Sequence, residues 1–211
     1  VGLNRKYFGN KGENQKTLQY FYNVILNNYR TETIPNVSDA IADLPKLYPS
    51  QEDYRVGSRK YSHLPNITEI NWHIPRYHNR RDIDIFKILA HDIAKGENKY
   101  QNIEALKKLY TEKTGKISNV HKYYVLRWDQ PSNTIPAHLK KDGLRHIHPD
   151  PEQARSITVR EAARLQTFDD DFEFIGSMVQ NYEMIGNAVP PKFSGKLASA
   201  IYDLLFEKGM A

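Results

Sequence analysis

The chain has 211 residues, with 30 lysine and arginine side chains against 25 aspartate and glutamate side chains and no cysteine. Its length suits one sizeable domain, alone or with a smaller appended part. The missing cysteines exclude disulfide bonds, zinc–thiolate sites and thiol nucleophiles within it. Because no apolar run reaches the roughly 20 residues of a membrane span and the first residues lack the layout of a signal peptide, we expect a cytoplasmic protein without a membrane partner.

The first 80 residues are predicted to hold two helices and then a loop. Apolar side chains that share one face predict a helix over residues 15–29. A short helix is expected over residues 39–44, capped by Ser38 and ended by Pro45, because proline disfavours helical geometry in the residue before it. Residues 49–80 are rich in proline, asparagine, tyrosine and histidine, which is typical of a loop.

A helical pair is predicted in the middle of the chain. Residues 82–95 carry an apolar stripe at helical spacing, and Gly96 suits the end of that helix. A second helix is expected over residues 103–112, capped by Asn102 and ended by Gly115. We expect the two helices to form a hairpin that packs on a sheet.

Short stretches that favour β-structure follow between residues 123 and 147, separated by turn residues, and predict strands and hairpins. The overall charge of +5 permits a phosphate-rich partner without establishing one. The positive balance is concentrated between residues 116 and 148, where two aspartates oppose six basic side chains. These six are Lys116, Lys122, Arg127, Lys140, Lys141 and Arg145.

Helices are predicted again in the last quarter of the chain. Thr158 and Glu161 have the spacing of a capping box, and the helix they begin is expected to run through Gln166. A loop is expected to lead to residues 185–191, and the last helix to begin at the prolines there. The apolar stripe of that helix consists of Phe193, Leu197, Ala200, Ile201 and Leu204.

Two long motifs in this last quarter carry a resemblance. Residues 156–174, SITVREAARLQTFDDDFEF, and residues 182–201, YEMIGNAVPPKFSGKLASAI, resemble the ninth and tenth motifs of DNA cytosine-5 methyltransferases, in the order and spacing of that family. Residues 127–149, RWDQPSNTIPAHLKKDGLRHIHP, resemble the end of the family's target-recognition region. Asp169 stands where the family usually has a proline, and we expect a looser turn there.

The resemblance extends more weakly over nearly the whole chain. Val1 and Gly2 resemble the tail of the eighth motif, and residues 38–45 and 73–86 resemble segments that follow that motif in some members. It implies an α+β fold in which residues 1–180 form a small β-rich target-recognition domain with flanking helices, including a helical segment at about 82–112. Residues 181–211, the tenth motif and the C-terminal helix, would belong to a catalytic α/β domain of Rossmann-like fold.

The chain lacks what the family uses for chemistry. Members attack carbon 6 of cytosine with a cysteine thiolate, and this chain has no cysteine and no PCQ-like, ENV-like or FxGxG-like string. We therefore expect no catalytic residue here and no activity from the chain alone. It would be either an excised fragment or the smaller subunit of a split enzyme, with an N-terminal catalytic domain or subunit as its partner.

The resemblance also implies binding residues. Thr134 and Ile135 would hold the DNA backbone and position a flipped-out cytosine, with plain strand residues as the alternative. Gly186, Asn187 and Ala188 would line half of an S-adenosylmethionine pocket. Basic and histidine side chains in the recognition region are candidates for phosphate and major-groove contacts. They are Arg127, His138, Lys140, Lys141, Arg145, His146 and His148.

Other polar residues are interpreted as structural. Arg160 and Arg164 are expected to pair with nearby carboxylates, and Glu161 to cap a helix. His146 and His148 lack a clear third ligand, so we expect no metal site. The C-terminal helix would dock on the missing domain, and its exposed apolar face predicts self-association.

The function that follows is DNA recognition within a DNA (cytosine-5-)-methyltransferase. The complete enzyme would transfer a methyl group from S-adenosylmethionine to carbon 5 of a flipped-out cytosine in duplex DNA, in a restriction–modification system. The alternative is a non-catalytic, sequence-specific DNA-binding or regulatory module. A third possibility is a protein-interaction module built on the helical pair, which would show no salt-dependent binding to DNA.

Overall fold

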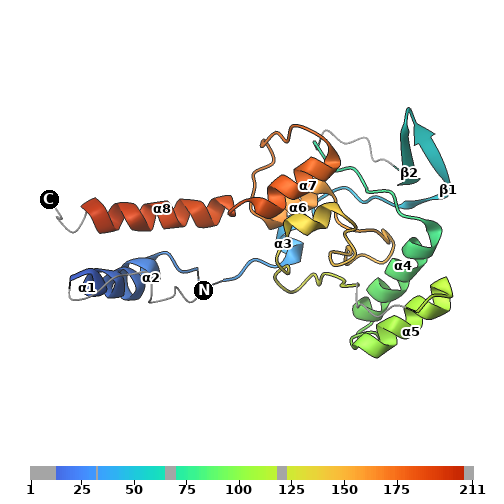
Figure 1. The fold of residues 1–211 in the computed structure, drawn as a ribbon, viewed down its shortest axis with the longest axis horizontal. Coiled ribbons are helices and arrows are strands. Elements are labelled where there is room, and N and C mark those ends of the chain that lie inside the picture. The colour runs from blue at the N-terminus through green and yellow to red at the C-terminus, as the bar shows by residue number, and fades with distance from the viewer. Residues whose placement is uncertain (1–12, 32, 65–69, 118–122, 207–211) are drawn as a thin grey trace. The chain divides into compact units, whose positions relative to one another are not determined.

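The computed structural model describes residues 13–31, 33–64, 70–117 and 123–206, which divide into two compact units. Unit 1 combines Val1–Ile34 with Val189–Ala211, and unit 2 is Pro35–Ala188. Figure 1 shows the helices and strands of both. In the described part of the chain, no helix is both long and apolar enough to cross a membrane.

The described part of unit 1 is mainly helical. The segments α1 (Glu13–Tyr20), η2 (Phe21–Ile25, a π-helical turn) and α2 (Leu26–Asn28) follow one another directly and confirm the helix predicted over 15–29. The last helix, α8 (Pro191–Phe206), begins at the prolines as predicted and packs against η2. The Tyr29 hydroxyl donates to the Asp203 carboxylate between these segments.

Unit 2 begins with the short helix α3 (Val37–Ile41), where the predicted cap is wrong. Asn36, not Ser38, is the capping residue: its side chain accepts from the Asp39 amide, and Asp39 accepts from the Asn36 amide, both at 2.9 Å. This reciprocal pair satisfies two backbone amides at once, so the helix begins two residues earlier than predicted.

A β-hairpin lies where the sequence predicted a loop. Strands β1 (Pro49–Val56) and β2 (Arg59–His63) pair antiparallel, and Gly57, with a φ of 58°, begins the two-residue turn between them. The loop prediction is wrong for residues 49–63, because the pairing depends on cross-strand contacts rather than on apolar alternation, and it is confirmed for residues 70–79. The Tyr54 hydroxyl, for example, donates to the carbonyl of His63.

The predicted helical pair is confirmed by α4 (Arg80–Ala94) and α5 (Ile103–Thr114), which contact each other. Asn102 caps α5, and Gly115 ends it in the left-handed conformation. The expected sheet beneath the pair is absent from the described residues, so that part of the prediction is wrong. The helices instead pack on irregular segments that contribute Tyr123, Val125 and Ile147 to their core.

Residues 123–148 do not form the predicted strands and hairpins. Their described part contains only isolated bridges from Ile147 to Val125 and to Ser156, and one short 3₁₀-helix, η3 (Ala137–Lys140). Pro131 and Pro136 have no backbone N–H to donate, which explains why a regular ladder does not form across this stretch.

Two capped helices complete unit 2. The Thr158–Glu161 capping box begins α6 (Val159–Leu165) as predicted, and Gln166 ends it. The residues expected to be a loop before residue 188 instead form α7 (Met178–Asn187), capped by Ser177. With its single two-stranded sheet and its helices, the described chain has an α+β fold, as expected. The expectation of a β-rich domain is wrong, because β1 and β2 are the only strands among the described residues.

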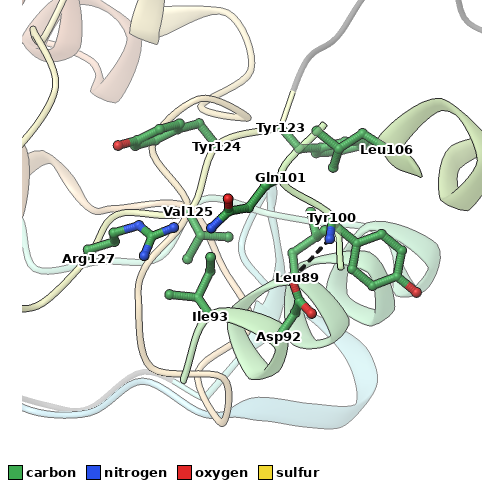
Figure 2. A pocket seen from close by; sticks show the side chains of 10 residues that line it. All are labelled: Leu89, Asp92, Ile93, Tyr100, Gln101, Leu106, Tyr123, Tyr124, Val125 and Arg127. Carbon is green, nitrogen blue, oxygen red and sulfur yellow. Dashed lines mark hydrogen bonds between the residues drawn. The ribbon is translucent and has the colours of Figure 1, made fainter. Parts of the chain in front are cut away.

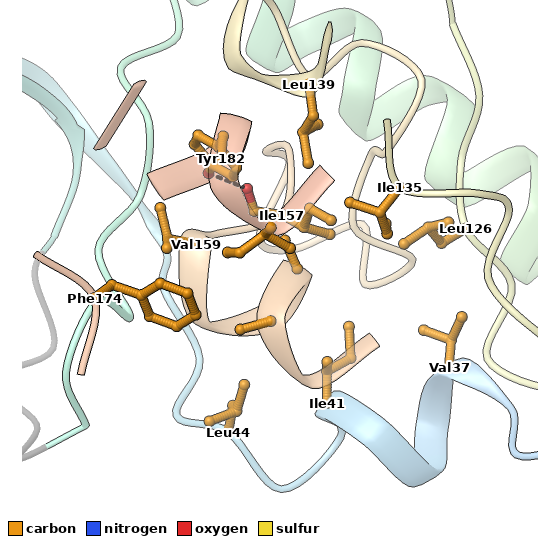
Figure 3. Packing of buried hydrophobic residues seen from close by; sticks show 13 residues of the cluster. Val37, Ile41, Leu44, Leu126, Ile135, Leu139, Ile157, Val159, Phe174 and Tyr182 are labelled. Carbon is orange, nitrogen blue, oxygen red and sulfur yellow. Dashed lines mark hydrogen bonds between the residues drawn. The ribbon is translucent and has the colours of Figure 1, made fainter. Parts of the chain in front are cut away.

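The main core of unit 2 gathers side chains from distant parts of the sequence (Figure 3). Ile157 lies between the helices and the irregular segments, and the Tyr182 hydroxyl of α7 donates to its carbonyl at 2.7 Å. Ile135 and Leu139 join this core, so the irregular recognition stretch is held by packing rather than by a sheet. The buried members are Val37, Ile41, Leu44, Leu126, Ile135, Leu139, Ile157, Val159, Ala162, Ala163, Phe174, Tyr182 and Ile185.

Candidate nucleic-acid interface

Residues predicted to contact DNA lie directly against residues 186–188, which are predicted to line the cofactor site and are called the cofactor segment below. We call residues 134–140 the recognition segment. A Cβ atom on Gly186 of α7 would lie 2.2 Å from the amide nitrogen of Ala137 and 2.3 Å from the carbonyl carbon of Pro136. Lys140 and Glu183 form an ion pair across the same contact. The absence of a side chain at Gly186 therefore lets α7 approach the backbone of the recognition segment closely.

Thr134 and Ile135 take different positions. Thr134 is exposed, and its carbonyl lies 3.1 Å from the ring Nε2 of His146. Ile135 is only 4% exposed and belongs to the core. The buried isoleucine thus anchors the backbone while the neighbouring threonine faces solvent.

The predicted cationic contacts divide by exposure. His138, Lys141 and Arg145 are exposed, and Lys140 is half-buried in its ion pair with Glu183. The Arg145 carbonyl accepts from the side chain of Asn133 at 3.1 Å, which fixes the backbone that carries this arginine beside the recognition segment. Three of the predicted contacts are therefore free to meet a phosphate or a base edge.

His146 and His148 are not available for DNA contacts, contrary to their assignment from sequence. Both are 2% exposed. Burial lowers the pKa of His146 to about 4 and that of His148 to about 3, so both rings are neutral at neutral pH. They act within the fold, because the His146 ring contacts the Thr134 carbonyl and Nδ1 of His148 accepts from the Asp150 amide.

A buried ion pair that the sequence did not reveal holds this region together. Arg155, 0% exposed, donates two hydrogen bonds of 2.7 Å to Glu161, which is 1% exposed. Burial would raise the pKa of Glu161, but the charge and hydrogen bonds of Arg155 hold it well below its usual range. Glu161 also accepts from the Thr158 amide at 2.7 Å. The capping-box pattern identifies Glu161 as a helix cap but does not indicate that Arg155 is its ion-pair partner.

The two arginines of α6 have the structural roles expected of them, with one correction. Arg164 pairs with Asp170 and Asp43 as predicted. Arg160 is fully buried and donates chiefly to backbone carbonyls rather than to carboxylates. Its acceptors are the carbonyls of Asn71, Asp169 and Phe172, at 2.9 to 3.1 Å. The Asp169 turn is therefore held by Arg160 even though the family's usual proline is missing.

The cofactor segment supplies a partial site. Asn187 is the last residue of α7 and is exposed, and Ala188 follows in extended conformation. The space beside Gly186 is filled by the protein's own backbone, so this glycine does not form a cradle for a ligand. One carboxamide fits the edge of an S-adenosylmethionine site, and the rest of such a site would have to come from elsewhere.

Arg127 lies apart from the recognition segment, in a pocket of about 250 Å³ beside α4 and α5 (Figure 2). Figure 2 shows its guanidinium pointing toward Val125 and Gln101. The Asp92 carboxylate on the pocket wall accepts from the amides of Lys99 and Tyr100 and so orders the link between the helices. Arg127 therefore lines this pocket, whereas no residue of the recognition segment does. Among the described residues, no group of three or more histidines and acids is placed to hold a metal ion.

Comparisons with known proteins agree with the motifs. The family description C-5 cytosine-specific DNA methylase matches residues 5–203. A type II methyltransferase of Bacillus paralicheniformis is 37% identical over 180 residues, which cover 79% of this chain and 40% of that protein. An Oceanobacillus iheyensis protein named as a candidate type II methyltransferase is 33% identical over 202 residues, which cover 78% of this chain and 43% of that protein.

A plant protein is also similar. DNA (cytosine-5)-methyltransferase 2 of Arabidopsis thaliana is 39% identical over 111 residues, which cover 50% of this chain and 7% of that protein. The chain spans about two fifths of the length of the two bacterial relatives, at 40% and 43%.

Proposed function

The chain belongs to the C-5 cytosine-specific DNA methylase family, and from this premise we propose that it is the DNA-recognising part of a DNA (cytosine-5-)-methyltransferase. The type II methyltransferases among its relatives support a place in a restriction–modification system. Its substrate would be duplex DNA with one cytosine turned out of the helix.

The close contact between α7 and the recognition segment carries this proposal. Gly186 abuts the backbone of Pro136 and Ala137, and Lys140 pairs with Glu183. The residues proposed to meet DNA are therefore fixed to the residues proposed to meet the methyl donor. A methyltransferase requires this coupling, because the donor and the extruded base must be held within reacting distance of each other.

Each exposed residue of the interface has a proposed role. Thr134, held by the burial of Ile135, would contact the DNA backbone beside the extruded cytosine. Lys141, Arg145 and His138 would meet phosphates, and Arg127 would meet DNA farther from the target base. These contacts position the duplex and do not themselves perform chemistry.

The chemistry would require a second segment. The chain has no cysteine, so the thiolate that attacks carbon 6 must come from a Rossmann-like catalytic domain or subunit. S-adenosylmethionine supplies the methyl group when it is bound, and Asn187 and Ala188 would form one edge of its site. We propose that residues 181–211 complete that catalytic domain and that residues 1–180 form the recognition domain. The chain alone would then be inactive.

A non-catalytic DNA-binding or regulatory module is the second candidate. The exposed cations of the recognition region favour it as much as they favour the enzyme part, because neither role needs a nucleophile in this chain. The two candidates differ only in the response to a cysteine-bearing partner.

DNA binding by the chain alone tests the recognition role. We expect a fluorescently labelled duplex to bind with an affinity that falls linearly with salt on a logarithmic scale, because lysine and arginine contacts release counterions from the phosphates. The measurement is fluorescence anisotropy across a salt series, with a single-stranded oligonucleotide as the control. No binding at low salt, or binding that does not change with salt, would contradict the proposal.

A further inference from the structure

The β1–β2 hairpin is anchored at its base and exposed at its turn, while Arg59 after the turn is half-buried. The His63 ring is buried and lies 2.9 Å from the carbonyl of Gln153, and the Ser62 hydroxyl oxygen accepts from the amide of His78 at 2.9 Å. At the other end, the residues from Arg55 to Ser58 are exposed. Figure 1 shows the hairpin at an edge of unit 2. The strands therefore present a narrow ribbon whose position is fixed by its buried end.

The charges along the ribbon divide into a neutralised base and a cationic tip. Asp53 is paired with Lys60 at 2.9 Å and with Arg80 at 2.8 Å, and it accepts from the Tyr77 hydroxyl. These contacts neutralise the negative charge of Asp53, the carboxylate of the strands that lies nearest to the turn. Glu52 is the other carboxylate of the strands and lies one residue nearer to the base.

The two arginines at the tip have no carboxylate partner among the described residues. Arg55 donates only to the Ser58 carbonyl, at 3.2 Å within the same turn. Arg59 contacts the Met178 sulfur at 3.6 Å and lies over the Tyr61 ring, 5.1 Å from its centroid. Such contacts orient a guanidinium while leaving its charge uncompensated.

The side chain of Arg59 is held in place before any ligand arrives. Tyr54 and Tyr61 face each other across the strands, and their rings stack at 5.4 Å between centroids. Arg59 continues this stack toward the turn. A pre-oriented guanidinium loses less side-chain entropy when it binds and can direct both of its nitrogens to one acceptor pair.

A two-stranded ribbon has the dimensions of the major groove. Paired strands lie about 4.8 Å apart, and the groove of B-form DNA, about 12 Å wide, admits such a ribbon with its side chains. We propose that the tip of the β1–β2 hairpin enters the major groove of duplex DNA, where Arg59 reads the edge of a guanine and Arg55 contacts a phosphate. This inference rests on the proposed function and names the element that selects the sequence.

Helix α7 connects the Arg59 contact with the recognition segment, beside which the target cytosine is proposed to lie. Met178, which touches Arg59, lies at the start of α7, and Gly186, which touches the recognition segment, lies near its end. Eight residues of helix span roughly 12 Å, which is the rise of about three to four base pairs. The guanine read by Arg59 is therefore expected within about four base pairs of the methylated cytosine.

Selection from a duplex pool with a randomised centre tests the proposal on the complete chain. The wild-type chain is expected to enrich a preferred sequence. The Arg59→Lys variant keeps the charge but loses the planar fork, so it should lose about tenfold or more of the preference at one guanine while keeping the salt dependence. The Arg55→Ala variant should bind all sequences more weakly, with a salt slope reduced by about one.

The double variant Lys108→Ala/Lys113→Ala is the matched control, because it removes two exposed charges from α5 and should leave sequence preference unchanged. Thermal melting verifies that each variant is folded. If both hairpin variants keep the wild-type preference, affinity and salt slope, the hairpin proposal is overturned while DNA recognition stands. If the wild-type chain binds no duplex at all, the proposed function and the hairpin proposal fail together.

Discussion

The two units of the chain differ in how many of their described side chains are buried. Unit 2 encloses two apolar cores and buries Arg155, Arg160 and Glu161 almost completely. Among the described residues of unit 1, only Ile25 and Ala200 are buried. Unit 2 therefore has the interior of a self-supporting domain, whereas the apolar side chains in the described helices of unit 1 form no comparable core among themselves.

The exposed apolar surface of unit 1 is concentrated on α8. Phe193 is 59% exposed and Phe206 is 66% exposed, and both lie on a helix with few charges. Exposed apolar side chains in such number mark a surface that another element covers. This difference supports the proposal that α8 completes a catalytic domain, with self-association as the alternative when that domain is absent. The other exposed large apolar residues of α8 are Ile201, Tyr202 and Leu205.

Acidification should affect unit 2 most strongly. Burial lowers the pKa of His63 and of His146 to about 4 and that of His148 to about 3, and that of His78 falls well below its usual value. The unfolded chain takes up these protons near pH 6.5 and the folded chain does not, so stability is present above pH 6.5 and is lost as pH falls below it. Each histidine should cost about 1.4 kcal/mol per pH unit.

Thermal melting of the chain between pH 7 and pH 5 measures this loss. The helices of unit 1 contain no histidine in their described part and should respond much less. The variant His138→Ala is a control, because this exposed side chain makes no buried contact and its removal should leave the pH dependence unchanged. A melting temperature that stays constant down to pH 5 would contradict the account of buried, neutral histidines.

Removal of the buried arginine should have the next largest effect. The variant Arg155→Leu leaves the Glu161 carboxylate buried without its charge partner, and we expect a loss of about 3–5 kcal/mol in the free energy of unfolding. Urea denaturation followed by circular dichroism measures it. The control is Lys87→Ala, whose partner Glu152 is exposed, and its cost should be below about 1 kcal/mol. Equal losses of stability in the two variants would show that the buried ion pair stabilises the fold no more than the exposed one.

Adding a methyl group at Gly186 tests whether α7 must approach the recognition segment closely. Its Cβ would overlap the backbone of Pro136 and Ala137, so Gly186→Ala should destabilise unit 2 by about 1–3 kcal/mol and displace the recognition segment. Gly195 in α8 has open space around it, and Gly195→Ala should instead stabilise its helix by about 0.5–1 kcal/mol. Denaturant titration of both variants distinguishes the two sites, and a neutral Gly186→Ala would mean that α7 does not require close approach.

The smallest effect is expected on the exposed face of α8. The variant Phe193→Ala should change the free energy of unfolding by less than about 0.5 kcal/mol, because its side chain is mostly exposed. Phe86→Ala, on the buried face of α4, should cost about 3–5 kcal/mol. Sedimentation of the Phe193 variant also reports on self-association, which should weaken. A large stability loss at Phe193 would show that unit 1 has a core after all.

Local signals predicted most of the helices, although α7 and the start of α3 were missed. Asn102 with Gly115, and Thr158 with Glu161, bracket or begin helices through contacts within a few residues, so the sequence alone contains their cause. The β1–β2 hairpin was missed because its strands are polar and depend on partners such as Gln153 and His78, which are distant in sequence. Tertiary contacts of this kind leave no periodic signal.

The candidate site was predictable in its motifs and not in its geometry. The match of residues 134–140 and 186–188 to family motifs came from residue order alone, whereas the contact of Gly186 with Pro136 and Ala137 required the fold. The burial of His146 and His148 could not be predicted, because the sequence of a basic stretch does not indicate whether a histidine within it faces DNA or the core.

Methyl transfer tests the central claim most directly. Tritiated methyl groups from S-adenosylmethionine would be followed into duplex DNA with this chain alone, with a cysteine-bearing catalytic segment alone, and with both together. We predict incorporation only in the mixture, because the chain supplies recognition and the partner supplies the thiolate. Incorporation by the chain alone would contradict the assignment of catalysis to another segment, and a mixture that stays inactive while the chain binds DNA would favour the non-catalytic module.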